Sequence, residues 1–464
     1  MEIAGRDRLR IDADVDKGQP LHTAVDAAVV VLANEARDGR LAVCAGAGIS
    51  IPAGLPDGAE LARRLDERFQ RVHGYACASS DDLLAVADAA AGLEDGLAAV
   101  QRVVLDLAPF ATAVPQLGHQ LLALLLAEDA IRLLLTNWDD CVERSWRRIE
   151  HIPAARNELE AELLRGQFAL KIHGCCTQPE TLLITSAQLN EPPLWTKIYF
   201  QAELAQSTMV FVGIGDVADY AQQRITELAG LVPHARVRIV SPGIVANWDT
   251  SAWKALLPDV PDERRIPKSG DAFLDELARE WVMTLVGELK GPAGTTPPQW
   301  VTAVVLAFTQ LTALEALAWL RRAAVGWKVG ESVVRSAVTI SALEAIALLA
   351  RGDAGAALAT VRFLGGSAVA IGEERLEVVV CRDRLTSSDV EAIVADRAGR
   401  VVGRVGPLEE VHMLVAASSV RGPKPRELVG IDVVDPDATP DELIGGEQHV
   451  SIRLTWVDEV LEAA

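Results

Sequence analysis

Several clusters of small or polar residues directly follow short apolar runs in this chain. They are Gly46-Ala47-Gly48-Ile49-Ser50, Thr136-Asn137-Trp138-Asp139, His173-Gly174, Gly213-Ile214-Gly215-Asp216 and Ser241-Pro242-Gly243. Glycines in a turn let backbone N–H groups approach a phosphate closely, because glycine has no Cβ. An amide both donates and accepts hydrogen bonds, and a histidine titrates in the range that suits a general base. These residue types suit a largely dry cleft that orients a phosphate-bearing molecule and acts on it.

The apolar runs predict the strands that must position these clusters. The runs cover residues 41–45, 131–135, 168–172, 209–212 and 237–240, and they alternate with helical patterns at 21–37 and within 59–128. This alternation is typical of a doubly wound (Rossmann-like) α/β fold with a parallel sheet. Ligands of such sheets bind beyond the carboxyl ends of the strands, so we expect the clusters to meet at one edge.

Each cluster also has a purely structural interpretation. Residues 46–50 could form a tight strand-to-helix turn without a ligand, and a histidine at a strand end is often structural. Asn137 suits a turn or a helix N-cap, and Asp139 could cap the helix that follows it. His119 is interpreted as a support of the sheet. The functional interpretation depends on the clusters occurring together.

A turn-rich segment, residues 291–298 (GPAGTTPP), predicts a linker between two domains. We expect a catalytic domain at 1–290 and a separate α+β accessory domain of unknown role at 299–464. In the second domain, apolar helices are predicted within 299–351 and a helix at 387–396. Strands are predicted at 376–382, 400–405, 411–417, 427–434 and 449–456. No catalytic constellation is found there.

Composition limits the partners. The 464 residues carry a formal charge of −21, which disfavours direct binding to a nucleic-acid backbone. The first residues are charged and lack an apolar signal segment, so a cytoplasmic location is expected. Six cysteines without a CxxC pair predict neither a structural metal site nor a disulfide framework. Cys44 and Cys175 are interpreted as buried small residues, since no basic partner indicates a thiolate.

Residues 300–320 form the most apolar stretch and raise the question of a membrane helix. Gln310, Glu315 and three threonines interrupt it, and no continuous lipid-facing surface results. We therefore expect a buried helix between domains rather than a membrane span.

The motifs resemble those of the sirtuin family, in the same order along residues 20–250. The stretch from Gly46 through Pro56-Asp57 resembles its nucleotide-binding signature, residues 136–139 its Asn-x-Asp motif, and His173-Gly174 its His-Gly motif. The turns at 213–215 and 241 resemble its last two nucleotide-contacting turns. The resemblance implies a sirtuin-type sheet, with NAD as the bound dinucleotide.

The differences from this family are equally informative. Gly58-Ala59 replaces the Phe-Arg pair of protein-deacylating sirtuins, Thr136 replaces a glutamine, and the four zinc cysteines are missing. The sequence is more similar to the bacterial sirtuin-like branch with a TN(Y/W)D motif, found in antiviral defence effectors that hydrolyse NAD. This implies an NAD⁺ glycohydrolase. The alternatives are a protein deacylase or ADP-ribosyltransferase, and a non-catalytic NAD or ADP-ribose sensor.

The resemblance implies roles for individual residues. Asn137 would orient a water or the ribose hydroxyls, His173 would act as the base, and Asp139 would hold the nicotinamide carboxamide. The remaining predicted cofactor-binding residues are Gly46, Ala47, Gly48, Ser50, Pro56, Asp57, Thr136, Gly213, Gly215, Asp216 and Ser241. No metal is expected. By analogy with defence effectors, we expect control by homo-oligomerisation or by a partner protein.

Overall fold

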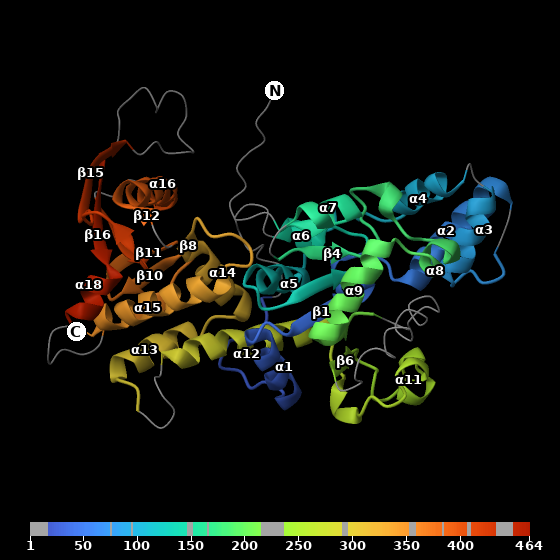
Figure 1. Cartoon of the computed structure of the whole chain (residues 1–464), viewed down its shortest axis with the longest axis horizontal. Coiled ribbons are helices and arrows are strands. Elements are labelled where there is room, and N and C mark those ends of the chain that lie inside the picture. Colours follow the sequence, from blue (N-terminus) through green and yellow to red (C-terminus); the bar gives the residue numbers. More distant parts are fainter. Residues whose placement is uncertain are drawn as a thin grey trace. The chain divides into compact units, whose positions relative to one another are not determined.

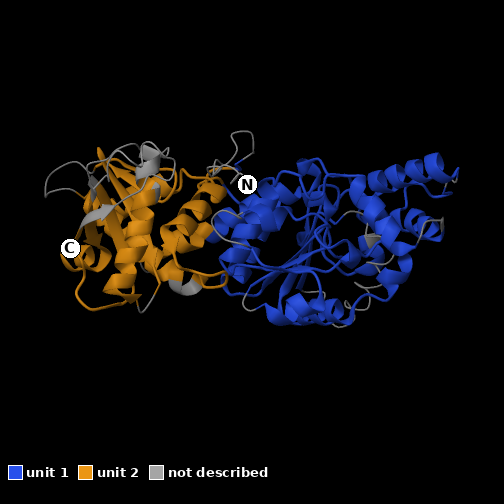
Figure 2. Ribbon diagram, turned by 90° about the horizontal axis from the view of Figure 1, so that it is seen from above, with its two compact units in different colours: residues 1–18, 24–281 blue, residues 19–23, 282–464 orange. Residues whose placement is uncertain are grey.

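A computed structural model describes residues 17–74, 77–93, 96–145, 152–164, 167–214, 236–289, 296–351, 359–382, 385–405, 410–432 and 449–464. The chain divides into two compact units (Figure 2). The first contains residues 24–281, and the second contains residues 19–23 and 282–464. The division falls within helix α12 (Gly270–Glu288). Residues 290–295 lie outside the described residues, so the linker at 291–298 remains a prediction.

The first unit is built on a seven-stranded parallel sheet with the order β3-β4-β2-β1-β5-β6-β7. Figure 1 labels β1, β4 and β6 of this sheet. The predicted strands are β1 (Leu41–Ala45), β2 (Arg132–Leu135), β4 (Ala169–Lys171), β5 (Thr208–Val212) and β6 (Val237–Val240). Two strands that the sequence did not reveal, β3 (Ala154–Ala155) and β7 (Arg265–Ile266), form the edges. The predicted Rossmann-like fold is confirmed.

Strand burial explains why the sequence predicts a sheet covered on both faces. All five residues of β1 are buried, and so are all five of β5. The covering helices include α1 (Ala27–Arg37), whose N-cap is Asp26, and α5 (Leu117–Ala127), which is buried along its length. The other helices of this unit are α2 (Gly58–His73), α3 (Leu83–Leu93), α4 (Leu97–Asp106), α6 (Cys141–Ser145), α7 (Glu158–Leu163), α8 (Ser186–Asn190), α9 (Leu194–Gln206) and α11 (Ala252–Leu256). Continuous apolar strands between helix layers are typical of parallel sheets.

The second unit contains a mixed sheet with the order β15-β16-β13-β11-β10-β9, and β8 pairs with β11. Its strands are β8 (Ala324–Val325), β9 (Val361–Phe363), β10 (Ala368–Ile371), β11 (Glu374–Cys381), β13 (Glu410–Ala417), β15 (Glu427–Asp432) and β16 (His449–Trp456). Strands β12 (Leu385–Thr386) and β14 (Val420–Arg421) form a separate pair. The helices are α13 (Gln299–Phe308), α14 (Ala313–Ala323), α15 (Ser332–Ala350), α16 (Ser387–Val405) and α18 (Val457–Glu462). The sequence predicted an α+β domain here, and the presence of a second region of helices and strands, with a mixed sheet, is confirmed.

Two predictions for this unit are wrong. Residues 400–405 form no strand, because they continue α16, whose Val390, Val394 and Val401 pack into one core cluster at helical spacing. Residues 300–320 form two helices, α13 and α14, rather than one. Thr312 begins α14 as an N-cap, with its hydroxyl accepting from the backbone N–H of Glu315. Within the described ranges, no helix has the length and apolarity that a membrane crossing requires.

Candidate active site

The ends of the central strands meet at one edge of the sheet, where backbone hydrogen bonds join the predicted clusters. The N–H of Gly46 donates to Val212 O at 3.0 Å, and the N–H of Gly48 donates to Gly213 O at 2.7 Å. The N–H of Thr136 donates to Ala45 O at 2.9 Å. Three segments that are distant in the sequence therefore lie side by side beyond β1, β2 and β5.

Gly46 and Gly48 are required by packing between two turns. A Cβ on Gly48 would lie 2.7 Å from both Cα and O of Gly213, and a Cβ on Gly46 would lie 2.9 Å from Gly213 O. Because the N–H groups of both glycines donate to β5 and its turn, neither is free for a phosphate in this conformation. The expected role of these two N–H groups is therefore not supported, and any contact of this turn with a ligand must use other atoms.

Asn137 and His173 occupy equivalent positions on neighbouring strands. Leu135 of β2 pairs with Lys171 of β4, and the two site residues each lie two positions beyond that pair. The N–H of Cys176 donates to Trp138 O at 2.7 Å, which joins the two loops. His173 is half-buried. The sheet thus brings the predicted amide and imidazole residues to the same edge.

A buried hydrogen-bond cluster surrounds Asn137. It consists of Ser50, His119, Asn137 and Asp139, which are between 0 and 5% exposed. The backbone N–H of Gln116 donates to Nδ1 of His119 at 3.1 Å, so a neutral His119 carries its proton on Nε2. Nε2 then donates to Ser50 Oγ at 3.1 Å, and Ser50 donates to Asp139 Oδ2 at 2.8 Å. The hydroxyl of Ser50 is thereby fixed as a donor to the carboxylate.

The amide of Asn137 has only one possible orientation in this cluster. Its Nδ2 donates to Asp139 Oδ2 at 2.7 Å and to Ser50 Oγ at 3.2 Å. A carboxylate only accepts hydrogen bonds, so the reversed amide would place two oxygens against each other. The other amide atom, Oδ1, is buried and has no hydrogen-bond partner among the described residues. A buried acceptor without a partner costs free energy, which a donor on a bound molecule or a water would recover.

The charge states of this cluster follow from burial and from Lys171. Burial lowers the pKa of His119 to about 4, so His119 is neutral near pH 7. Burial acts to raise the pKa of Asp139, but the charge of Lys171 and the hydrogen bonds from Ser50 and Cys141 hold it below its ordinary value. Asp139 is therefore a carboxylate.

Ser50, His119 and Asp139 do not form a nucleophilic triad. In such a triad a carboxylate accepts from Nδ1 of the histidine, whereas Nδ1 of His119 accepts from a backbone N–H. Asp139 Oδ2 accepts from the serine itself. This arrangement orients the amide of Asn137 rather than activating Ser50.

The other predicted site residues are placed as follows. Asp57 is the N-cap of α2, and its carboxylate accepts from the N–H of Glu60 at 2.8 Å. Ala47 is exposed, and Pro56, Thr136, Gly213 and Ser241 are half-buried, the last three at the same sheet edge. Gly215 and Asp216 lie outside the described residues. Their roles in binding remain predictions.

Comparison with known proteins identifies the domain. Residues 132–237, from the start of β2 to the start of β6, match the family profile described as the SIR2-like domain. The chain contains a SIR2-like domain. A solved structure of a Sir2 homologue–NAD complex is 14% identical, with a TM-score of 0.32, and the match covers 57% of this chain and 97% of that one. A structure of Sir2 bound to acetylated peptide is 15% identical, with a TM-score of 0.31, covering 53% and 95% respectively. Among curated proteins, none matches the chain.

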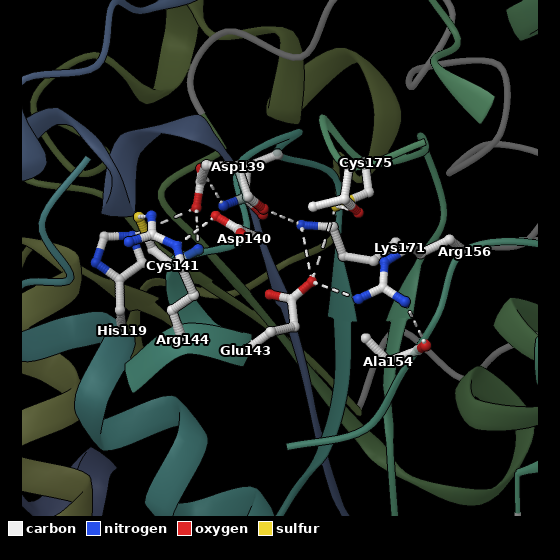
Figure 3. Close-up of polar contacts among 12 residues, drawn as sticks. His119, Asp139, Asp140, Cys141, Glu143, Arg144, Ala154, Arg156, Lys171 and Cys175 are labelled. Atoms are coloured by element: carbon white, nitrogen blue, oxygen red, sulfur yellow. Dashed lines mark hydrogen bonds and ion pairs between the residues drawn. The ribbon is translucent and has the colours of Figure 1, made fainter. Parts of the chain in front are cut away.

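The SIR2-like domain also contains a buried charged network that the sequence analysis missed (Figure 3). Lys171 is 0% exposed, and its Nζ donates to the backbone oxygen of Asp139 and lies 3.9 Å from Glu143 Oε1. Glu143 Oε1 lies 4.0 Å from Nη2 of Arg156. A lysine inside an otherwise apolar strand was the available signal, because a fully buried lysine requires a partner.

Cys175 is buried, as the sequence predicted, but a basic residue that the sequence did not reveal lies near it. Hydrogen bonding with Cys176 and the charge of Lys171, against the opposing effect of burial, hold the pKa of Cys175 below its ordinary value. The hydroxyl of Thr177 donates to its sulfur at 3.2 Å. The basic partner, Lys171, belongs to the preceding strand and forms no recognisable sequence motif with the cysteine. By contrast, burial alone raises the pKa of Cys44 to about 12.

One group of side chains in the described part of the chain could hold a metal ion. Ligand atoms of His119, Asp139 and Cys141 all lie within 4.8 Å of one another. Both ring nitrogens of His119 already have hydrogen-bond partners, however. Burial, followed by the charge of Asp139, raises the pKa of Cys141. A metal would therefore have to displace Ser50 or Gln116 from the imidazole of His119 and deprotonate the Cys141 thiol, whose pKa is raised.

Proposed function

We propose that the SIR2-like domain hydrolyses NAD⁺ to nicotinamide and ADP-ribose. The family profile supports the use of NAD, and the Sir2 homologue of the solved complex binds this dinucleotide. The observation that carries the proposal is the buried and unpartnered Oδ1 of Asn137, which Asp139 and Ser50 hold at the carboxyl edge of the sheet. Such an acceptor suits a water or a ribose hydroxyl.

The reaction requires little besides positioning. Nicotinamide leaves as a neutral molecule from a cationic pyridinium, and it keeps the electron pair of the broken C–N bond. A water oxygen forms the new bond to the ribose carbon, and its proton passes to a base. We assign the orientation of the water or ribose hydroxyls to Asn137 and the base to His173. His119 is unsuited to the base role, because it is fully buried and its pKa is about 4.

Asp139 is proposed to act chiefly by holding Asn137. Oδ2 accepts from Asn137 and Ser50, and Oδ1 accepts from the N–H of Cys141 at 3.1 Å. A contact with the nicotinamide carboxamide would have to use the remaining acceptor capacity of Oδ1. Gly213, Ser241 and the turn at 46–50 are proposed to shape the surrounding wall, together with Gly215 and Asp216.

We further propose that the protein is a regulated bacterial antiviral effector of the cytoplasm. The support is the TNWD motif at 136–139 and the absence from the sequence of the Phe-Arg pair and zinc cysteines of deacylating sirtuins. Control would come from homo-oligomerisation or a partner protein, with residues 299–464 as the accessory domain. To test this control, NAD⁺ turnover and oligomeric state are measured across a series of protein concentrations. An active protein whose turnover number does not change with its oligomeric state would contradict the proposal.

The proposed chemistry is tested by incubating the full chain with NAD⁺ and measuring nicotinamide and ADP-ribose. Asn137→Ala and His173→Ala should each slow release by about 10²–10⁴-fold, the range of a lost positioned catalytic group. The exposed residues Asn34 and His73 supply matched controls, Asn34→Ala and His73→Ala, which should retain wild-type turnover. Release that requires an acylated peptide would favour a deacylase, and stable binding of intact NAD⁺ would favour a sensor.

A further inference from the structure

A pocket lies beyond the ends of β3 and β4 in the SIR2-like domain. Its volume is about 420 Å³, within the size range of small-molecule sites. The lining comes from the ends of β3 and β4, the turn near residue 180 and the segment from α8 into α9. This pocket is separate from the buried hydrogen-bond cluster around Asn137, because none of that cluster's residues (Ser50, His119, Asn137 and Asp139) lines it.

The charged lining is arranged from a basic interior to an acidic opening. Arg156 and Lys171 supply the positive charges, and Lys171 is fully buried. Glu180 and Glu191 line the same pocket and are both exposed, so they belong to its opening. A basic interior and an acidic opening fit a ligand that carries both charges.

Arg156 retains binding capacity on the basic side. Its Nη1 contacts are long, at 3.4 Å to Ala154 O and 3.4 Å to Glu160 Oε2, and Nη2 is 4.0 Å from Glu143. Its Nε is buried, and no hydrogen-bond partner for it lies in the described part of the chain. Lys171, in contrast, is already engaged by Asp139 O and Glu143. The guanidinium also interacts with Cys175, but it is the less engaged of the two cations and the one that a ligand can reach.

The neutral polar side chains of the lining are already bonded within the protein. Thr181 donates to Gln178 O at 2.7 Å, and Thr196 donates to Pro193 O at 2.7 Å. Gln188 forms a capping box at the start of α8. Recognition of a ligand's polar groups thus falls on the charged residues, while Trp195 and Leu183 offer apolar surface.

We propose that this pocket binds a small zwitterion, with its carboxylate on Arg156, its amine at Glu180 and Glu191, and a short apolar body between. A guanidinium fork matches a carboxylate in geometry and charge. The two glutamates at the opening repel polyanions such as nucleotide phosphates, and they attract an ammonium group. Trp195 provides the surface along which the body packs.

A ligand in the pocket should affect the buried hydrogen-bond cluster around Asn137 through Lys171. This residue lines the pocket and also holds the backbone oxygen of Asp139, whose carboxylate orients Asn137. A ligand that moves Lys171 should therefore change NAD⁺ turnover. This second expectation rests on the proposed function, whereas binding of the zwitterion does not.

Calorimetry on the full chain without NAD⁺ tests the pocket with three probes of equal length: 6-aminohexanoate, hexanoate and hexylamine. The zwitterion should bind at least about tenfold more tightly than either single-charge probe, the ratio expected for one lost charge-assisted contact. Arg156→Gln should weaken its binding by about tenfold or more. Arg68→Gln, at an exposed arginine of α2, is the matched control and should have no effect.

The exposed pair Glu180 and Glu191 provides a second test that does not depend on a buried side chain. A Glu180→Gln/Glu191→Gln variant should reduce the affinity for 6-aminohexanoate to that for hexanoate. The proposal is overturned if millimolar zwitterion does not bind, if inorganic phosphate or hexanoate binds equally well, or if Arg156→Gln and the double variant both bind normally. If the zwitterion binds but NAD⁺ turnover is measurable and unchanged, only the proposed coupling through Lys171 is contradicted.

Discussion

Replacing His119 should change how the stability of the first unit depends on pH. Burial lowers the pKa of His119 from 6.5 to about 4. Because the folded-state pKa is below the unfolded-state pKa, protonation favours the unfolded chain. The stabilising contribution is intact above pH 6.5 and is lost as the pH falls towards 4. The full shift corresponds to about 3 kcal/mol, and about 2 kcal/mol of it is already lost at pH 5.

Urea unfolding at pH 7.5 and pH 5, followed by tryptophan fluorescence, measures this contribution. The wild-type free energy of unfolding should fall by about 2 kcal/mol more between these pH values than that of His119→Gln. His73→Gln, at an exposed histidine of α2, should behave like the wild type. Equal pH dependence of the wild type and His119→Gln would refute the assignment of His119 as a buried neutral imidazole.

Three further predictions address the packing and charges of the site. Gly48→Ala should lower the free energy of unfolding by about 1–3 kcal/mol, because the new Cβ would collide with the backbone of Gly213. Gly58→Ala is the control, since a Cβ there meets no described atom within 4 Å. Equal melting temperatures of the two variants would contradict this explanation. Asp139→Asn introduces an amide N–H that must face either Asn137 and Ser50 or the N–H of Cys141, and each of these positions now holds a donor. Nicotinamide release should therefore fall by about 10²-fold. Unchanged release would contradict the role of Asp139 in holding Asn137. Burial raises the pKa of Glu143 from 4.5 to about 7, so the folded protein loses stability as the pH rises from 4.5 towards 7. In urea unfolding, the free energy of unfolding of Glu143→Gln should not show this decrease.

The sequence predicted the elements of the site better than its contacts. Apolar runs bounded by glycine or polar residues located β1, β2, β4, β5 and β6, because buried parallel strands consist almost entirely of apolar residues. The strands β3 and β7 have two residues each, too few for any periodic pattern. The break between α13 and α14 was missed because apolar residues continue on both sides of Thr312, although Thr312 and Glu315 carry a capping-box signature.

The charged network was beyond sequence reasoning for a different reason. Glu143 and Arg156 come from two other segments, which only the fold brings to Lys171 and Cys175 at the end of β4. Lys171 interrupts an apolar strand, which indicates a buried charge but not its partner. The lack of a Cβ and the family resemblance both predict Gly46 and Gly48 as ligand contacts, while the structure explains these glycines by the approach of Gly213. A shared sequence motif can thus reflect packing as well as binding.

Release of nicotinamide by the full chain, compared with that by Asn137→Ala, tests the central claim most directly. Across a series of protein concentrations, the wild type should convert NAD⁺ to nicotinamide and ADP-ribose without an acyl peptide. Asn137→Ala should do so at least about 100-fold more slowly, with Asn34→Ala unaffected. NAD⁺ that binds but stays intact at every concentration, or an Asn137→Ala variant that is as fast as the wild type, would contradict the account.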